Sequence, residues 1–515
     1  MLHLVSGQPR SAAHAPTTRL RPTRQSHPAL ENTDMLKSVS DARLFFHRNN
    51  RPIYFVSASP FNLMGIDTWV SNFKFINLID CFDGRHPNVF TPPKDTDQEF
   101  QSMEEINNYL LSNNEVLDFI QGRKRGQAVF LMFDQETERL AKAAGLKIPF
   151  PRAKLRNRLD NKIETVRIGE RAGVPSVPNV LEKITSYEDL RKKAAALGEK
   201  LVVQTAFGDS GHTTFFISDK ASWARHASEI IEAGTVKIMK HINCRQAAIE
   251  ACTTRCGTVV GPLMTEIVGF KELTPYRGGW AGNEVSPNAF PLEVSEQARN
   301  LTFKFGEELR KTGYRGYFEL DFLIDIDTGE VWLGELNPRV TGASAMTNIA
   351  AFAFADMPLF LFHLLEFSGE EFDINIAEVN RRWQNPRNID SWSQLVIKYT
   401  DTDIGIIQDA PQSGIYRIGS DGQLDFDRFD LRRSNLDDFE EGFFLRIAGA
   451  GDYSYEGADL GILITKGRMM TNGHRLTRRA KAWINAIRNG YRTLPPSYGE
   501  ASSVTLQQPG AFKMI

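Results

Sequence analysis

The stretch of sequence that decides the fold is Gly316–Ser344, which reads GYFELDFLIDIDTGEVWLGELNPRVTGAS. Apolar and polar residues alternate over Phe318–Ile324, as in a strand with one buried face. The triplet Asp-Thr-Gly at 327–329 is typical of a tight turn, and we expect the return strand over Val331–Asn337. The stretch therefore predicts a β-hairpin.

Four polar side chains would share one face of this hairpin. A turn centred near Thr328 places Asp321 opposite Glu335, and Glu319 opposite Asn337. Carboxylates that face each other repel, unless one is protonated or a cation lies between them. Three carboxylates and an amide oxygen form a ligand set that suits Mg²⁺, with substrate phosphates completing the shell. From the residues alone, an exposed face of solvated acids is an equally good interpretation.

The sequence of this hairpin resembles the metal-binding end of the ATP-grasp superfamily, in its biotin-carboxylase-like branch. The resemblance rests on Asp321 in one strand and on the segment Glu335-Leu-Asn337-Pro-Arg339 in the next. It implies that Asp321, Glu335 and Asn337 bind Mg²⁺, or Mn²⁺, and that Arg339 lies over the reacting carboxyl–phosphate as the catalytic residue. A fixed guanidinium offsets charge that develops on oxygen during phosphoryl transfer. The alternative role for Arg339 is a structural ion pair with one of the acids.

A lysine upstream of the hairpin is a candidate phosphate ligand. Asp160-Asn-Lys162, followed by Gly173-Val-Pro-Ser-Val-Pro178, resembles the family element whose lysine contacts ATP. A lysine is a point charge that suits a polyanion. Without this resemblance, Lys162 would be interpreted as an ordinary solvated lysine on a helix.

The segment Leu201–Thr214, LVVQTAFGDSGHTT, resembles the strand and glycine-rich flap that close over the triphosphate in this family. Glycines let backbone N–H groups approach phosphate oxygens, and small hydroxyl residues add donors. Gln204 departs from the family pattern, in which this strand carries a second phosphate-binding lysine. Either the site has decayed, or the pocket has been rebuilt around glutamine. The resemblance implies that the following residues bind ATP: Gln204, Gly208, Ser210, Gly211 and Thr213.

The segment Thr235–Ile242 occupies the place where the family lets adenine contact the hinge backbone. The resemblance assigns Lys240 and Ile242 to that contact. Met239 stands where the family usually has an acid. Side chains matter little at a backbone hinge, so this assignment depends on position alone.

The order of elements predicts an α/β fold class with α+β lobes, because strand-like runs alternate with helical patterns. The resemblance covers residues 36–490 and implies an ATP-grasp fold. The expected organisation is a disordered tail at 1–35, an N-terminal pre-ATP-grasp α/β domain at 36–150, an ATP-grasp nucleotide- and metal-binding domain at 151–370, a biotin-carboxylase-like C-terminal lobe at 371–490 and a loose tail at 491–515.

Composition excludes several functional classes. The 515-residue chain has a formal net charge of −2, which gives no basic face for nucleic acid. The longest apolar stretch, Ile349–Phe367, is interrupted by polar residues and proline, so it predicts a buried helix rather than a membrane span. Four cysteines are too few for a disulfide scaffold and suit a reducing compartment. We therefore expect a cytoplasmic protein without a nucleic-acid or membrane partner.

Three departures argue against the carboxylation of biotin. The residues after Arg339 are Val-Thr-Gly-Ala-Ser344, where biotin carboxylase carries a glutamate. Gln204 replaces a lysine, and no biotin-accepting Met-Lys-Met segment occurs. The chain resembles instead the amino-acid and peptide ligases of the same branch. These join a carboxylic acid to an amine through an acyl phosphate, with release of ADP and phosphate.

Other functions stay open at this point. One is a nucleotide-binding regulatory module without turnover, and another is an ATP-grasp carboxylase or phosphotransferase. The segment Thr265–Ser286 is either a substrate loop, with Arg277 pairing with a substrate carboxylate, or a surface connection with a packed Trp280. The resemblance also allows a homodimer.

Overall fold

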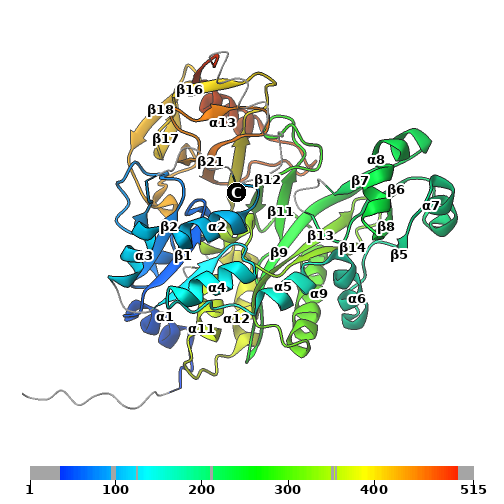
Figure 1. Ribbon diagram of the computed structural model, residues 1–515, viewed down its shortest axis with the longest axis horizontal. Coiled ribbons are helices and arrows are strands. Elements are labelled where there is room, and N and C mark those ends of the chain that lie inside the picture. Colours follow the sequence, from blue (N-terminus) through cyan, green and yellow to red (C-terminus); the bar gives the residue numbers. More distant parts are fainter. Residues whose placement is uncertain are drawn as a thin grey trace, which may run out of the picture.

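The computed structural model describes residues 35–93, 100–122, 126–208, 213–349, 353 and 356–496. The expected N-terminal tail, apart from Met35, and most of the expected C-terminal tail lie outside these residues. Helices and strands both occur along the described chain, and the strands form one parallel sheet and three antiparallel sheets, in line with the predicted α/β class (Figure 1).

The first sheet contains four parallel strands in the order β3-β2-β1-β4. Its strands are β1 (Ile53–Ser57), β2 (Phe73–Asn77), β3 (Val89–Phe90) and β4 (Gln127–Phe130). The helices of this part are α1 (Val39–His47), α2 (Met103–Ser112), α3 (Asn114–Gln121) and α4 (Gln135–Ala143). Every residue of β1 is buried, which explains its unbroken apolar run.

A small four-stranded sheet extends to one side of the molecule (Figure 1, right). Its strands, in spatial order, are β5 (Asn179–Lys183), β8 (Thr235–Lys240), β6 (Leu201–Gln204) and β7 (Thr214–Ile217). The helices α7 (Tyr187–Lys193) and α8 (Lys220–Glu232) share the core of this sheet, whereas α5 (Ala153–Leu159) and α6 (Lys162–Ala172) pack into the core of the large sheet described next. The sequence predicts a βαβ-like unit here. The structure contains one, β7-α8-β8, but β6 lies between its two strands and runs antiparallel to both.

The large sheet has eleven strands and connects the middle of the chain with its C-terminal part. Its spatial order is β14-β13-β9-β11-β12-β15-β21-β19-β17-β18, with β10 paired to β9. The strands are β9 (Cys244–Thr254), β10 (Gly257–Val260), β11 (Met264–Val268), β12 (Trp280–Val285), β13 (Gly316–Asp325), β14 (Val331–Asn337), β15 (Trp392–Lys398), β17 (Gly414–Ile418), β18 (Leu424–Arg428), β19 (Glu441–Arg446) and β21 (Asp459–Lys466). Strands after residue 370 therefore extend the sheet that carries the hairpin, through the pairing of β12 with β15.

The remaining elements cover this sheet or lie at its C-terminal end. The helices are α9 (Leu292–Lys311), α11 (Leu359–Glu366), α12 (Ile376–Gln384) and α13 (Arg478–Asn489). A three-stranded sheet is formed by β20 (Tyr453–Ser454), β16 (Gly405–Asp409) and β22 (Arg492–Leu494). Residues 359–365 of α11 are all buried, as predicted for the apolar stretch. No helix among the described residues is long and apolar enough to cross a membrane.

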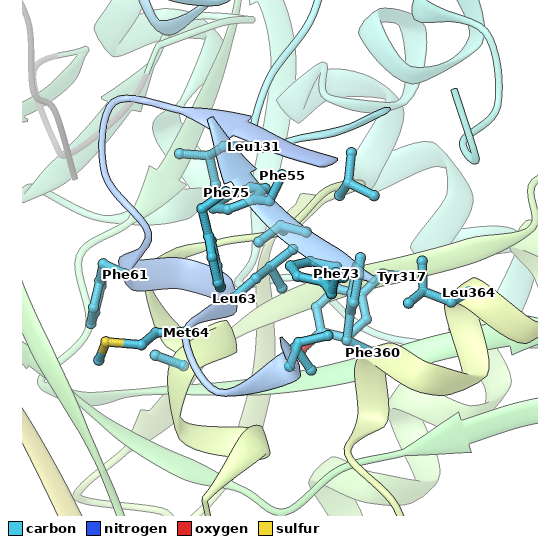
Figure 2. Close-up of a cluster of buried hydrophobic side chains, with 14 of the residues drawn as sticks. Phe55, Phe61, Leu63, Met64, Phe73, Phe75, Leu131, Tyr317, Phe360 and Leu364 are labelled. Atoms are coloured by element: carbon cyan, nitrogen blue, oxygen red, sulfur yellow. The ribbon is translucent and has the colours of Figure 1, made fainter. Parts of the chain in front are cut away.

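One hydrophobic core joins the first sheet to the large sheet. Figure 2 shows Phe73 of β2 gathered with Tyr317 of β13 and Phe360 of α11 in a single buried cluster. This shared core fixes the first sheet against the large one. The residues that follow β4, Leu131 and Met132, are thereby held beside the site described next.

Candidate active site

The candidate site is a cavity of about 720 Å³ between the small sheet and the large sheet. Strands β6, β7 and β8 line one side of it, and β9, β11, β13 and β14 line the other. Met103, Leu131 and Met132 add a third side from the first sheet and its helices. Residues that are distant in the sequence therefore meet at this cavity.

The acidic hairpin face forms as predicted, with one difference. Glu319 pairs with Asn337 across β13 and β14, as expected from a turn centred near Thr328. The register shifts between Leu320 and Phe322, so the backbone around Asp321 faces a β-bulge. The extra residue is on β14, and a side chain at Gly334 would lie 3.0 Å from the Asp321 carbonyl oxygen.

Protonation relieves the repulsion on this face. Burial, followed by the charges of neighbouring glutamates, raises the pKa of Asp321 well above its usual value. Burial opposes ionisation of Glu335 as well, but the charge and hydrogen bond of Lys162, with the Arg339 charge and a hydrogen bond from Asp321, together lower the pKa of Glu335. The opposite shifts favour a proton on Asp321 rather than on Glu335, with a hydrogen bond between the two carboxyl groups. A cation at this place would displace that proton.

The donor set fits Mg²⁺. Among the described residues, no three Asp, Glu, His or Cys side chains lie close enough to hold a metal ion by themselves. The expected ligand set therefore reduces to Asp321, Glu335 and the Asn337 amide, whose Nδ2 lies 3.4 Å from Asp321 Oδ2. Two carboxylates and an amide oxygen suit a cation that keeps several waters and binds substrate phosphates.

Lys162 is placed at this face by the start of α6. The Asn161 side chain caps the helix by accepting from the N–H groups of Ile163 and Glu164, which fixes Lys162 at the first helical position. Its ammonium is buried and forms an ion pair with Glu335. Burial alone would lower the pKa of Lys162, but the charge and hydrogen bond of Glu335 raise it. The lysine singled out by resemblance thus lies at the predicted metal site.

Arg339 follows β14 and lies at the same face. Its Nη2 donates to Asn337 Oδ1 at 2.9 Å. Burial and neighbouring glutamates raise the pKa of Glu319 well above its usual value, and the Arg339 charge offsets part of that rise. The guanidinium is half-buried and lines the cavity. Arg339 is therefore held beside the metal-ligand set through the Asn337 amide.

A buried glutamate that the sequence interpretation missed fixes the chain after Arg339. Glu250 of β9 accepts hydrogen bonds from four hydroxyl groups at 2.5–3.2 Å: those of Tyr317, Thr341, Ser344 and Thr347. Three of these hydroxyls belong to the segment Thr341–Thr347. Glu250 therefore anchors this segment, and with it Arg339. The sequence offers one sign of this role, since Glu250 is the one acid in β9, next to small residues.

An apolar slot occupies the hinge end of the cavity. Val202 of β6 and Met239 of β8 are register partners, and they cluster with Val177, Ile242 and Leu323. The Lys240 N–H donates to the Pro178 carbonyl, and the Lys240 side chain is exposed. No described residue accepts from the Ile242 N–H. Of the two hinge residues assigned from resemblance, Ile242 therefore retains an available backbone donor.

Of the predicted flap residues that the structure describes, Gln204 ends β6, and Gly208 and Thr213 lie between β6 and β7. Gln204 Nε2 donates to Thr214 Oγ1 at 3.1 Å, and both residues line the cavity. Gly208 has a φ of +129°, and a Cβ atom there would lie 2.2 Å from Thr213 Oγ1. The approach of these two segments therefore requires glycine. Ser210 and Gly211, also assigned to ATP binding, lie outside the described residues.

The opposite end of the cavity is aromatic and polar. Trp280 Nε1 donates to Asn283 Oδ1 at 3.1 Å, and Gln394 Nε2 donates to the Gly342 carbonyl at 2.7 Å. A side chain at Gly342 would lie 2.3 Å from the Trp280 ring, so the ring packs against the segment after Arg339. Trp280 thus both packs against the protein and lines the cavity. Within the segment Thr265–Ser286, the predicted packing of Trp280 is confirmed, and a role as substrate loop stays a prediction.

Arg277 does not have the free guanidinium that its predicted role would need. The guanidinium lies over the ring of Phe216, a residue of β7, at 4.8 Å from the ring centre. This contact joins the loop before β12 to the small sheet across the cavity. A substrate carboxylate would have to compete with the Phe216 ring for Arg277.

Two acids, the buried Glu250 and the partly buried Glu266, predict that stability falls as the pH rises. Burial raises the pKa of Glu250 to about 7 and, together with the Glu335 charge, that of Glu266 to about 8. Between about pH 6.5 and 7.5 the folded protein holds protons that the unfolded chain has lost, so the free energy of unfolding decreases as pH rises. Burial lowers the pKa of three histidines, which makes the free energy of unfolding increase with pH, but mainly below about pH 6.5. These are His86, His363 and His474.

Thermal unfolding at several pH values checks this prediction. We expect the Tm of the wild-type protein to fall over this interval, and Glu266→Gln to reduce the slope. A wild-type Tm that rises with pH, or an equal slope in the variant, would contradict the assignment of Glu266 as a protonated acid.

Comparison with solved structures identifies the fold. The biotin carboxylase domain of Hydrogenobacter thermophilus 2-oxoglutarate carboxylase aligns with a TM-score of 0.56 at 12% identity, covering 87% of this chain and 91% of that one. Biotin carboxylase from Campylobacter jejuni gives 0.53 at 12% identity, covering 90% and 91%. An ADP complex of N5-carboxyaminoimidazole ribonucleotide synthetase gives 0.51 at 13% identity, covering 81% and 93%. The chain has the ATP-grasp fold in its biotin-carboxylase-like form.

These likenesses are in structure and extend over most of each chain. No protein-family model and no curated protein matches the sequence. At such low identity the shared property is the fold, and function has to be argued from the site itself.

Proposed function

We propose that the protein is an ATP-dependent carboxylate–amine ligase, which forms an amide or peptide bond through an acyl phosphate. One observation carries this proposal. A single cavity joins three surfaces: the apolar slot at Val202 and Met239, the acidic face with Arg339, and the aromatic and polar end at Trp280. These surfaces suit a base, a metal-bound triphosphate and an organic substrate respectively, in the order that phosphoryl transfer requires.

The nucleotide side of the proposal rests on the slot, the hinge and Lys162. An adenine ring suits the apolar slot, with the Ile242 N–H as a hydrogen-bond donor. Lys162 forms an ion pair with Glu335, and its ammonium would donate to a phosphate bound beside that carboxylate. Mg²⁺ held by Asp321, Glu335 and Asn337 would neutralise phosphate charge during transfer.

The proposed reaction has two steps. A carboxylate oxygen of the acid attacks the γ-phosphorus of ATP, the β–γ P–O bond breaks, and ADP leaves with the electron pair. The amine nitrogen then attacks the acyl carbon, the C–O bond to phosphate breaks, and the nitrogen loses a proton to solvent. Arg339 holds the carboxylate beside the acidic face and offsets negative charge on the phosphoryl oxygens. The small sheet over the cavity limits access of water to the acyl phosphate.

The segment after Arg339 favours a ligase over a biotin carboxylase. The carboxylase domain from Hydrogenobacter thermophilus was solved with MgADP and bicarbonate, which supports a nucleotide and a carboxylate-like substrate for this fold. In this chain the residues 340–344 contain no acid, and their hydroxyl groups are engaged by Glu250. A base for bicarbonate is therefore missing from the place where the resemblance would put it.

A substrate screen tests the proposal. ADP release would be measured with ATP, Mg²⁺ and a panel of carboxylic acids, each with and without amines, amino acids and dipeptides. We expect ADP release to require both an acid and an amine for at least one pair, and the product to contain a new C–N bond. ADP release with bicarbonate and biotin, or with an alcohol acceptor alone, would favour carboxylation or phosphotransfer instead. ATP binding without turnover across the panel would favour a regulatory module.

A further inference from the structure

A second buried lysine lies beside the candidate site, on the central strand β8 of the small sheet. Lys237 is 0% exposed. It is the direct register partner of Gln204 on β6, two pairs along from the pair of Val202 with Met239. Side chains of directly paired residues point to the same face of a sheet. Lys237 and Gln204 therefore share the sheet face that looks toward the acidic hairpin.

The ammonium of Lys237 is only partly compensated. Its Nζ donates to the Gly334 carbonyl at 3.0 Å, next to Glu335 and at the β-bulge opposite Asp321. Among the described residues this neutral carbonyl is its one hydrogen-bond acceptor. Burial lowers the pKa of Lys237 to about 8, the charge of Glu335 opposes that shift, and Lys162 adds to it. A buried ammonium without a hydrogen-bonded anion is costly, so an anionic ligand nearby would stabilise it.

The charge of Lys237 lies across from Gln204, the position at which this chain departs from the family pattern. The family resemblance places a second phosphate lysine at position 204, where this chain has a neutral amide. The adjacent strand supplies an ammonium directly across from it. Lys162 and Glu335 lie next to the same charge, and they line the cavity. The positive charge absent from β6 is thus present one strand away.

We propose that Lys237 is the second positioning charge for the polyphosphate of the nucleotide, and replaces the lysine that is missing at position 204. The inference rests on the proposed function, since it needs a nucleotide in the cavity. Lys237 acts from behind the cavity wall through its field, which is strong over short distances in a buried environment, while Gln204 and Lys162 are the groups that line the cavity.

Relocating the charge tests this assignment. Binding of ATP and of adenosine would be titrated, with and without Mg²⁺, for the wild-type protein, Gln204→Lys, Lys237→Gln and the double variant Gln204→Lys/Lys237→Gln. We expect Lys237→Gln to weaken ATP binding at least about tenfold, since a buried charge acts strongly on the triphosphate over a short distance, and to leave adenosine binding unchanged, because adenosine carries no phosphate. Gln204→Lys alone should stay within about tenfold of wild type, or 1.4 kcal/mol, without increasing turnover, because the site is already compensated.

The double variant is decisive, because a merely structural lysine could not be rescued from another strand. We expect it to recover most of the ATP affinity that Lys237→Gln loses. Glutamine keeps a donor for the Gly334 carbonyl, and Lys237→Met serves if the glutamine variant does not fold. ATP binding by Lys237→Gln equal to wild type, or a double variant as weak as Lys237→Gln, overturns the assignment. A large gain in affinity and turnover for Gln204→Lys alone would also overturn it and would support a decayed site.

The same titration separates the two proposals. A wild-type protein that binds ATP, with no effect of Lys237→Gln, contradicts only the role of Lys237. A wild-type protein that binds no ATP at millimolar concentration contradicts the proposed function and the role of Lys237 together.

Discussion

Replacing Glu335 with glutamine is expected to abolish measurable turnover at ordinary Mg²⁺ concentrations, a loss of at least about 1000-fold by analogy with the removal of a group that stabilises transition-state charge. The variant loses the carboxylate that the site offers to a metal and the ion-pair partner of Lys162. Its amide keeps the shape of the side chain, so the fold should persist. Turnover would be measured as ADP release across a range of Mg²⁺ concentrations, with the Tm as a check on folding.

Glu330→Gln is the matched control for this experiment. Glu330 is exposed and lies just before β14, in the same hairpin but away from the acidic face. It should keep wild-type turnover and Mg²⁺ dependence. Near-normal activity of the Glu335 variant, with an unchanged Mg²⁺ dependence, would show that Glu335 is not a metal ligand.

Removing the guanidinium of Arg339 should lower kcat by about 100- to 1000-fold, the usual cost of losing one fixed donor to transition-state charge. Arg339→Ala removes one of the two cations beside the acidic face, the other being Lys162, and frees the Asn337 oxygen that accepts from the guanidinium. Arg339→Lys retains the charge but not the planar fork, so it should recover only part of the rate. Initial rates at saturating ATP, with KM for each substrate, measure both variants.

Separate effects on kcat and KM distinguish a catalytic role of Arg339 from a structural one. A group that acts in the transition state affects kcat with little change in the KM for ATP. A purely structural role would instead lower Tm and leave the rate of the folded fraction intact. Arg167→Ala provides the control, because Arg167 is a largely exposed arginine of α6 whose partner is Glu164.

The sequence allowed much of the hairpin to be predicted, and the reason is local. Alternation over β13 and the turn at 327–329 define both strands, and they also predict the pairing of Glu319 with Asn337. The bulge at Asp321 was not predictable, because one extra residue leaves no mark in a pattern of alternating polarity. The buried helix α11 was also predictable, since its apolar run is too interrupted to span a membrane.

Residues that depend on long-range pairing were missed. Lys237 appeared to belong to a backbone hinge, because nothing local reveals that β8 pairs with β6 in the register that sets it opposite Gln204. The pairing of β11 with β12, and of β12 with β15, brings three further polar residues to the site. Glu266 lines the cavity, and behind its wall Gln394 donates to Asn283. The same pairing extends the large sheet beyond residue 370. Such contacts are set by tertiary packing rather than by the pattern of any one segment.

The identity of the nucleotide product tests the central claim most directly. The protein would be incubated with ATP, Mg²⁺ and an acid–amine pair found in the screen, and the nucleotides separated by chromatography. Attack of the carboxylate on the γ-phosphorus predicts ADP and orthophosphate in equal amounts, and one ¹⁸O atom in the phosphate when the acid carries ¹⁸O in its carboxylate. AMP and pyrophosphate, or orthophosphate without the label, would contradict an acyl-phosphate ligase.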